Sequence, residues 1–263
     1  MTALPTDRST SAQEAPARPR PGEESLRQTV RRLGAAQKGA KGAPAYSRFV
    51  NRKLGRLLAA VAFHLRLTPN AVTGISAVFT FSGIAVLALV PGSWPVGVAV
   101  SLLLVIGYAF DAADGQLARL RGGGSPAGEW LDHMVDALKI ASLHLALLVG
   151  LYRFAPVERG PWLLLPLGFS IVSVVLFFGT LLNESLRSQH GATTRAAASA
   201  GRPSVLRSLV VVPTDYGLLC LVFLLLGAVQ VFLAVYAVVG ALTAAYLVLA
   251  AGRWFREMGE LAS

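Results

Sequence analysis

Charged residues and cysteines are scarce in this sequence of 263 residues. Only 14% of its residues are charged, whereas soluble domains contain about 25%. The single cysteine, Cys220, excludes a disulfide framework. Hydrophobic residues make up 54%, which excludes a wholly disordered chain, because disorder requires few apolar residues and many charges. The remaining class is an integral membrane protein with one membrane domain.

Two further features are missing. Residues 1–45 contain no apolar run that could be the core of a signal peptide. The sequence also contains no glycine-rich loop of the P-loop kind and no nucleic-acid-binding motif. The high pI of about 10.5 is therefore attributed to the basic residues that flank the predicted membrane spans. No nucleic-acid partner is expected.

Two segments precede the apolar blocks. Residues 1–45 are rich in Pro, Ala, Arg and Gly without apolar periodicity, which predicts a disordered cytoplasmic tail. Over residues 46–67, apolar residues recur at helical spacing and basic residues fall largely between them. This pattern predicts an amphipathic juxtamembrane helix that lies on the membrane surface. The apolar positions are Phe49, Val50, Leu54, Leu57, Leu58, Val61 and Leu65.

Long uncharged stretches follow. Residues 71–90, 95–110 and 161–182 carry no charge, and 137–152 carries only Lys139. The uncharged run 216–252 is too long for one crossing of about 20 residues, so we expect a break between Gly227 and Gln230. The expected fold is all-α, a six-helix membrane domain over 68–256 with a short cytoplasmic tail over 257–263. Its transmembrane helices are expected near 70–90, 94–120, 127–153, 161–186, 209–228 and 231–253.

Basic residues set the expected orientation of these helices. Thirteen Lys and Arg residues precede Thr68. On the same side lie the basic residues after spans two, four and six, whereas only Arg153 and Arg159 lie on the other side. The positive-inside bias therefore places both termini in the cytoplasm, and an odd number of spans would disturb this arrangement.

Four aspartates interrupt the apolar blocks on the cytoplasmic side. Asp111 and Asp114 are three residues apart, and Asp132 and Asp136 are four apart, so each pair occupies one helical face. The intervening sequence GGGSP, residues 122–126, breaks the helix, since Ser125 can cap the next helix and a proline fits its first turn. Two antiparallel helices would then present four carboxylates to one another.

This cluster predicts a site for hard divalent cations. A charge within a membrane helix costs about 2.5–3.5 kcal/mol, so the acids need counter-charges or a water-filled cavity. Oxygen ligation favours Mg²⁺ or Mn²⁺, and two such ions would neutralise a pyrophosphate. Gly115, Ala118 and Gly128 leave room for a ligand, and Arg119 can bind phosphate. A structural ion-pair network is the alternative, but it does not explain the ordered glycines.

These residues resemble the signature of the CDP-alcohol phosphotransferase family. All eight defining positions are present in order and with permitted spacing: Asp111, Asp114, Gly115, Ala118, Arg119, Gly128, Asp132 and Asp136. The resemblance extends over roughly Leu67 to Arg253. The segment from Thr68 to Thr73 also resembles the family's entry into its first span.

The resemblance implies a six-span inner-membrane enzyme that forms a homodimer, with its active site facing the cytoplasm. Such an enzyme cleaves the pyrophosphate of a CDP-linked donor, passes the phosphoalcohol to an acceptor hydroxyl and releases CMP. It implies that Asp111, Asp114 and Asp132 bind the metals, and that Asp136 also lies at the metal site and acts as general base. The implied nucleotide contacts are Gly115, Ala118, Arg119, Gly128, Asn70 and Thr73.

The expected substrates are CDP-diacylglycerol and a soluble alcohol. A soluble CDP-alcohol with a lipid or polyol-phosphate acceptor is the alternative. Candidate acceptor contacts are Asn183, Glu184, Arg187, Arg195, Arg202, Arg207, Thr214, Asp215 and Tyr216. For the loop arginines, the positive-inside bias alone is an equally good explanation.

Two other functions are weighed against the transferase. An intramembrane prenyltransferase also uses aspartate-bound Mg²⁺, but such enzymes generally have more spans and two separated aspartate-rich motifs. A divalent-cation transporter would often show internal repeats, and none is evident here. His133 follows Asp132 but points about 100° away on a helix, which favours a packing role over metal ligation.

Overall fold

The computed structural model describes residues 24–35, 44–155, 160–192 and 214–261. Within these ranges every regular element is helical, which confirms the expected all-α class. Five helical stretches are long and apolar enough to cross a membrane, and they establish a multi-pass membrane protein. They are α3 (Pro69–Leu89), α4 (Trp94–Leu120), α5 (Pro126–Phe154), η2 with α6 (Pro161–Leu163 and Leu164–Gln189), and a stretch containing α10 (Val229–Glu260).

The sixth predicted span is represented by a shorter stretch. Helix α9 (Tyr216–Val222) continues into the 3₁₀ segment η4 (Phe223–Gly227), and together they fall below the usual crossing length. Residues 209–213 of the predicted span lie outside the described residues. The chain leaves helical geometry at Ala228, which confirms the predicted break between Gly227 and Gln230. The count of six spans stays a prediction.

The prediction of a disordered tail is wrong for residues 26–35. These residues form helix α1 (Leu26–Ala35), which packs on α2 (Arg52–His64). Thr29 and Leu33 lie one turn apart and are buried, and Thr29 Oγ1 lies 3.0 Å from His64 Nε2. A tertiary partner therefore provides the burial that the local sequence lacks. The remainder of the tail, 1–23 and 36–43, lies outside the described residues.

The helix expected over 46–67 consists of the π-helical segment η1 (Ser47–Asn51) and α2. Its small residues face the protein: Gly55 lacks a side chain, and a Cβ there would lie 2.8 Å from the Cβ of Ala112 on α4. Several of its large apolar residues, including Leu54 and Leu57, are exposed, whereas Phe63 is buried. This distribution is the one expected of a helix in contact with lipid, although that contact stays a prediction.

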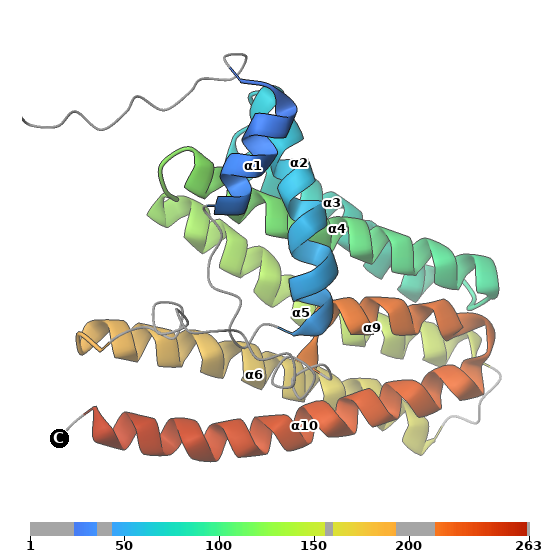
Figure 1. Ribbon diagram of the computed structural model, residues 1–263. Helices are drawn as coiled ribbons and strands as arrows, with labels where there is room; N and C mark the ends of the chain where they lie inside the picture. The colour runs from blue at the N-terminus through green and yellow to red at the C-terminus, as the bar shows by residue number, and fades with distance from the viewer. Residues whose placement is uncertain (1–23, 36–43, 156–159, 193–213, 262–263) are drawn as a thin grey trace, which may run out of the picture.

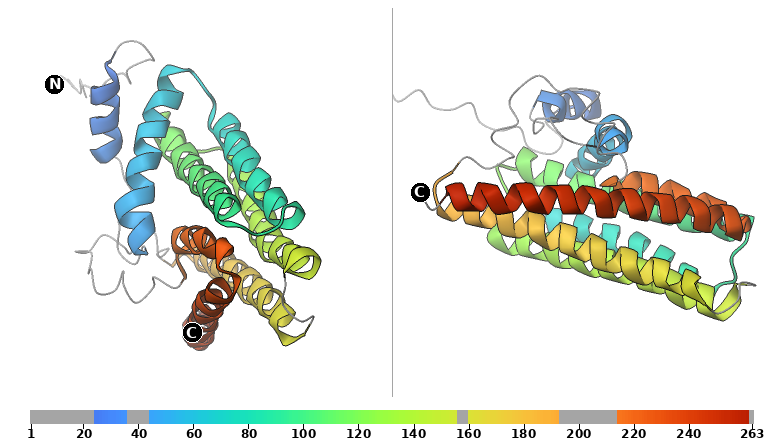
Figure 2. Two further views of the ribbon diagram at one scale, coloured as in Figure 1. Left: turned by 90° about the vertical axis from the view of Figure 1, so that its right-hand side faces the viewer. Right: turned by 90° about the horizontal axis from the view of Figure 1, so that it is seen from below.

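The long helices run side by side, and α2 crosses them (Figures 1 and 2). Helix α4 is central, because it contacts α2, α3, α9 and η4. One apolar core lies among α3 to α6, α9, η4 and α10, and a second lies among α1 to α4.

Serine and threonine caps define where three of the long helices begin. Thr68, Ser93 and Ser125 each accept a backbone N–H in the first turn of α3, α4 and α5, and a proline follows each cap within two residues. The turn between α4 and α5 contains Gly122 and Gly123 at φ of 112° and 128°. The glycines thus allow the chain to turn between Leu120 and Pro126, where the sequence predicted the helix to break.

Candidate active site

A cavity of about 320 Å³ lies between α4, α5 and the η1–α2 segment. Asp111 and Asp114 of α4 and Asp132 of α5 line it, so three of the four predicted acids meet at one cavity. Gly115 and Arg119 line it as well, as the motif predicted. The volume lies within the range of about 300–1,000 Å³ that is usual for small-molecule sites.

Asp114 is held by two hydrogen bonds. Thr73 Oγ1 on α3 donates to Asp114 Oδ2 at 2.7 Å, and the backbone N–H of Gly115 donates to Asp114 Oδ1. Both Thr73 and Asp114 are buried. Thr73 was predicted to contact the nucleotide, but its observed contact is with this carboxylate, so the threonine orients an acid of the site.

Lys139 lies between the two helices that carry the acids. Its side chain is only 6% exposed, and Nζ lies 3.4 Å from Asp111 Oδ1. It also pairs with Asp136 Oδ1, one turn earlier on α5. The ring centre of Tyr216 lies 5.0 Å from Nζ. The structural alternative expected ion pairs of Lys139 with the acids, and these pairs are present at the acid cluster itself.

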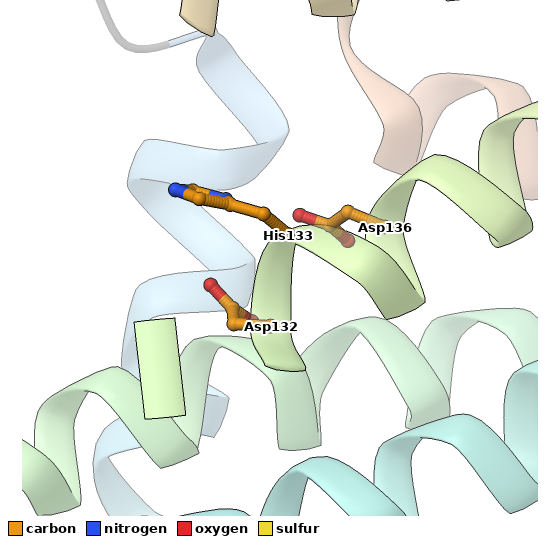
Figure 3. A group of neighbouring side chains, drawn as sticks. All are labelled: Asp132, His133 and Asp136. Carbon is orange, nitrogen blue, oxygen red and sulfur yellow. The ribbon is translucent and has the colours of Figure 1, made fainter. Parts of the chain in front are cut away.

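The first turns of α5 supply a second arrangement of ligand atoms. One ligand atom from each of Asp132, His133 and Asp136 lies within 4.8 Å of the others. Figure 3 shows the three side chains extending from α5 toward the same side. His133 was predicted to pack rather than to bind metal, and its Nε2 also lies 3.9 Å from Glu129 Oε1. His133 and Asp136 are three residues apart, which is the spacing that could have revealed their shared face.

The small residues of the motif have different surroundings. A Cβ on Gly115 would lie 3.5 Å from Arg119 Nη1, so the guanidinium lies near this glycine. A Cβ on Gly128 would lie 3.0 Å from Asn70 Oδ1, so these two residues, each named separately as a nucleotide contact, are neighbours. Ala118 is half-buried on α4. The described lining of the cavity does not include Ala118, Gly128 or Asn70.

Several lining residues were missed by the sequence reasoning. They are Ser47, Asn51, Arg52, Tyr108, Ala112 and Gln116. Asn51 Nδ2 donates to the carbonyl of Tyr108 at 3.1 Å, while its buried Oδ1 has no hydrogen-bond partner. Arg52 brings a second guanidinium to the cavity. These residues belong to η1, α2 and the neighbouring face of α4, where no spacing in the sequence marks a site.

The predicted acceptor contacts are mostly engaged within the protein. Asn183 donates to the carbonyl of Gly179, and Arg187 lies 3.6 Å from Glu257. Asp215 Oδ2 accepts from the backbone N–H groups of Tyr46 and Ser47. Thr214, Asp215 and Tyr216 line a separate cavity of about 240 Å³. Arg195, Arg202 and Arg207 lie outside the described residues.

Comparison with protein families decides the class of this site. The model of the CDP-alcohol phosphatidyltransferase family matches residues 66–250, which is most of the chain. This chain belongs to the CDP-alcohol phosphatidyltransferase family. It is an integral-membrane transferase of phospholipid biosynthesis that moves a phosphatidyl group from a CDP-linked donor to an alcohol. Prenyl transfer and cation transport are thereby disfavoured.

Two solved structures are similar to this chain. One is Mycobacterium tuberculosis phosphatidylinositol phosphate synthase (PgsA1) with CDP-DAG bound: 21% identity, a TM-score of 0.46, and coverage of 76% of this chain and 92% of that chain. The other is the same synthase in complex with manganese and citrate: 19% identity, a TM-score of 0.40, and coverage of 73% and 85%. At this level of similarity neither structure bears on the substrates of the present enzyme. No curated protein matches the chain.

Proposed function

We propose that this enzyme transfers a phosphatidyl group from CDP-diacylglycerol to the hydroxyl of a soluble alcohol and releases CMP. The observation that carries the proposal is the shared cavity, in which Asp111, Asp114 and Asp132 face Arg52 and Arg119. Carboxylates for cations and guanidinium groups for phosphates are the two types of group that a pyrophosphate requires.

The donor set fits a hard divalent cation, Mg²⁺ or Mn²⁺. Asp132 and Asp136 offer carboxylate oxygens within 4.8 Å of one another, and His133 offers a ring nitrogen at the same place. Asp111 and Asp114 add oxygens from the facing helix. Such a cation, when bound, supplies charge that stabilises the departing phosphate. His133 suits Mn²⁺ better than Mg²⁺, because Mg²⁺ strongly prefers oxygen ligands.

Side chains of the protein carry out the remaining steps, which are removal of the hydroxyl proton and binding of the donor phosphates. Asp136 accepts the proton of the attacking hydroxyl, since a neutral alcohol is a poor nucleophile and a carboxylate within hydrogen-bond reach can remove its proton. Arg119 and Arg52 bind the donor phosphates from α4 and α2. Gly115 leaves its backbone accessible to the donor beside Arg119, and Asn70 with Gly128 forms a further nucleotide contact. Ala118, which lies on the next turn of α4 outside the lining of the cavity, is proposed as a further contact of the bound nucleotide because the family resemblance implies it.

The proposal includes the arrangement of the protein in the membrane. Six spans over 68–256 place both termini, the tail over 1–45 and the active site in the cytoplasm of a cell with an inner membrane. The segment 46–67 lies on the membrane surface, and its exposed leucines support this placement. The enzyme is proposed to be a homodimer, as the family resemblance implies.

An acceptor panel tests the proposed reaction. Purified protein is incubated with CDP-diacylglycerol, Mg²⁺ or Mn²⁺, and separate soluble alcohols such as glycerol 3-phosphate, inositol phosphate and serine, and released CMP is measured. We expect CMP release with one acceptor class and a loss of about 100-fold or more in Asp136→Asn. The matched control is Glu260→Gln, an exposed acid on α10.

Two outcomes would contradict parts of the proposal. CMP release by Asp136→Asn at the wild-type rate would exclude Asp136 as the base. Turnover with a soluble CDP-alcohol and a lipid acceptor, but none with CDP-diacylglycerol, would establish the alternative substrate pair.

A further inference from the structure

One wall of the active-site cavity is formed by the η1–α2 segment, which contributes Ser47, Asn51 and Arg52 to the lining. The opposite side of η1 is open, because Phe49 and Val50 are 43% and 40% exposed. The segment begins in π-helical geometry, which is rare and occurs frequently at functional sites. A wall that is covered on one side depends on a few contacts for its position.

Asp215, the residue before α9, makes the first of these contacts. Its Oδ2 accepts hydrogen bonds from the backbone N–H groups of Tyr46 at 2.8 Å and Ser47 at 3.2 Å. Its Oδ1 accepts from the N–H of Gly217 at 3.1 Å and thereby caps α9. The aspartate is buried, and hydrogen bonds to a carboxylate are stronger than those between neutral groups. One side chain therefore joins the beginning of η1 to the beginning of α9.

Aromatic rings reinforce the same connection. Tyr46 stacks on Tyr108 of α4 with 6.4 Å between ring centres, and Tyr108 meets Tyr216 of α9 edge to face at 5.1 Å. A Cβ on Gly217 would overlap with the ring of Tyr46, so this ring lies directly against the backbone of α9. The beginnings of η1 and α9 thus meet at Tyr108, one turn before the first acid of the site.

Two further hydrogen bonds connect the wall to α4 next to the cavity. Asn51 Nδ2 donates to the carbonyl of Tyr108 at 3.1 Å, and Gln116 Nε2 donates to the carbonyl of Arg52 at 3.3 Å. Both distances exceed the usual 2.9–3.0 Å of an N–H···O bond, so neither contact is strong. The position of Arg52 at the cavity therefore also depends on the contact that Asp215 makes at the beginning of η1.

We propose that Asp215 is a positioning residue of the donor site: by holding the beginning of η1 on α9, it keeps Arg52 where the guanidinium binds the donor phosphates. This inference rests on the proposed function, which assigns those phosphates to Arg52 and Arg119. The sequence predicted Asp215 as an acceptor contact. The two roles differ in kinetics, because a positioning residue affects the donor and an acceptor contact affects the alcohol.

Asp215→Ser separates the contact with η1 from the cap of α9. Serine is also a good N-cap residue, but its shorter side chain cannot supply the second oxygen that Tyr46 and Ser47 share. We expect the KM for CDP-diacylglycerol to rise about tenfold, while the KM for the acceptor is unchanged. Gly217→Ala, which displaces the ring of Tyr46, should have the same kinetic effect.

A double-mutant cycle shows whether Asp215 acts through Arg52. Arg52→Met alone should raise the donor KM about tenfold, and adding Asp215→Ser should then raise it less than about twofold, because the positioned group is already absent. In Arg119→Met, which removes the guanidinium of α4, Asp215→Ser should still raise the KM about tenfold. Ser93→Ala removes the cap of α4 and is the matched control: it should lower the midpoint of thermal unfolding and leave the donor KM unchanged.

Hydrogen exchange tests the contact with η1 without any substrate. Backbone amides of residues 46–52 should exchange about tenfold faster or more in Asp215→Ser than in the wild type, because local opening of this segment becomes easier. Exchange in α3 should be unchanged. In Ser93→Ala, exchange over 46–52 should equal that of the wild type.

The outcomes separate this inference from the proposed function. An unchanged donor KM in Asp215→Ser would overturn the inference, while CMP release by the wild type still supported the transferase. A full tenfold rise in the Arg52→Met background, or a rise confined to the acceptor KM, would also overturn it. If the wild type released no CMP from CDP-diacylglycerol, the proposed donor and the donor role of Asp215 would both fail, and exchange over 46–52 would still decide whether Asp215 holds η1.

Discussion

The hydroxyl of Thr73 donates a hydrogen bond to Asp114 across the contact between α3 and α4. The two residues are far apart in the sequence, and Asp114 faces the active-site cavity. Groups that hydrogen-bond a ligand carboxylate fix its orientation, and their loss typically costs about 10–100-fold in metal affinity or activity. Thr73 therefore orients an acid of the site although Thr73 itself does not line the cavity.

Thr73→Val tests this relationship. Valine has nearly the same shape but lacks the donor, so Asp114 loses a partner and its orientation. We expect the Mn²⁺ concentration for half-maximal CMP release to rise about tenfold or more. The control is Thr180→Val, an exposed threonine whose hydroxyl bonds the backbone of its own helix. Equal responses of the two variants would contradict a role for Thr73 at Asp114.

Gly115→Ala tests whether the donor binds against Gly115, because this substitution should affect donor binding without affecting the stability of the fold. A Cβ at this position would meet Arg119 Nη1 at 3.5 Å, which is an ordinary contact, so thermal unfolding should be unchanged. If the donor lies against this glycine, the KM for CDP-diacylglycerol should rise about tenfold, equivalent to about 1.4 kcal/mol of binding. Gly124→Ala in the open turn is the control. An unchanged KM would remove Gly115 from the donor contacts.

Asp215→Asn tests the connection between α9 and η1. Asp215 is buried and accepts hydrogen bonds from the backbone of Tyr46, Ser47 and Gly217. An amide cannot accept at both positions, so we expect a loss of about 1–3 kcal/mol of stability, measured as a lower midpoint of thermal unfolding in detergent. A midpoint within error of the wild type would show that these contacts do not stabilise the fold.

Leu33→Ala tests the docking of α1. Leu33 is 2% exposed and packs in the cluster formed with α2, so its truncation should weaken the contact by about 2–5 kcal/mol. Trypsin should then cleave after Arg31 or Arg32 faster than in the wild type, as followed by mass spectrometry. Leu26→Ala, at an exposed position of the same helix, is the control. Identical cleavage of all three proteins would contradict the docking.

The sequence predicted the α4–α5 part of the site well, and the reasons are local. The spacings of the aspartates follow the helical repeat, and Ser125 and Pro126 mark where α5 begins. By contrast, Asn51 and Arg52 reach the cavity only because Gly55 lets α2 approach α4. No periodicity within residues 46–67 encodes that approach.

Tertiary contacts also explain two features that the sequence did not predict. The nucleotide contact of Thr73 stays a prediction, and its hydrogen bond to Asp114 joins residues that are 41 positions apart. Helix α1 is short and polar, and its stability depends on burial of Thr29 and Leu33 by α2. A partner so distant in the chain cannot be inferred from local composition.

The turn at Gly122 and Gly123 has a consequence for biosynthesis. Because it joins α4 directly to α5, the four acids and the lysine that pairs with two of them all belong to one helical hairpin. Because a charge within a membrane helix is costly, we expect the pairing of Lys139 with Asp111 and Asp136 to lower the cost of inserting these two consecutive helices together.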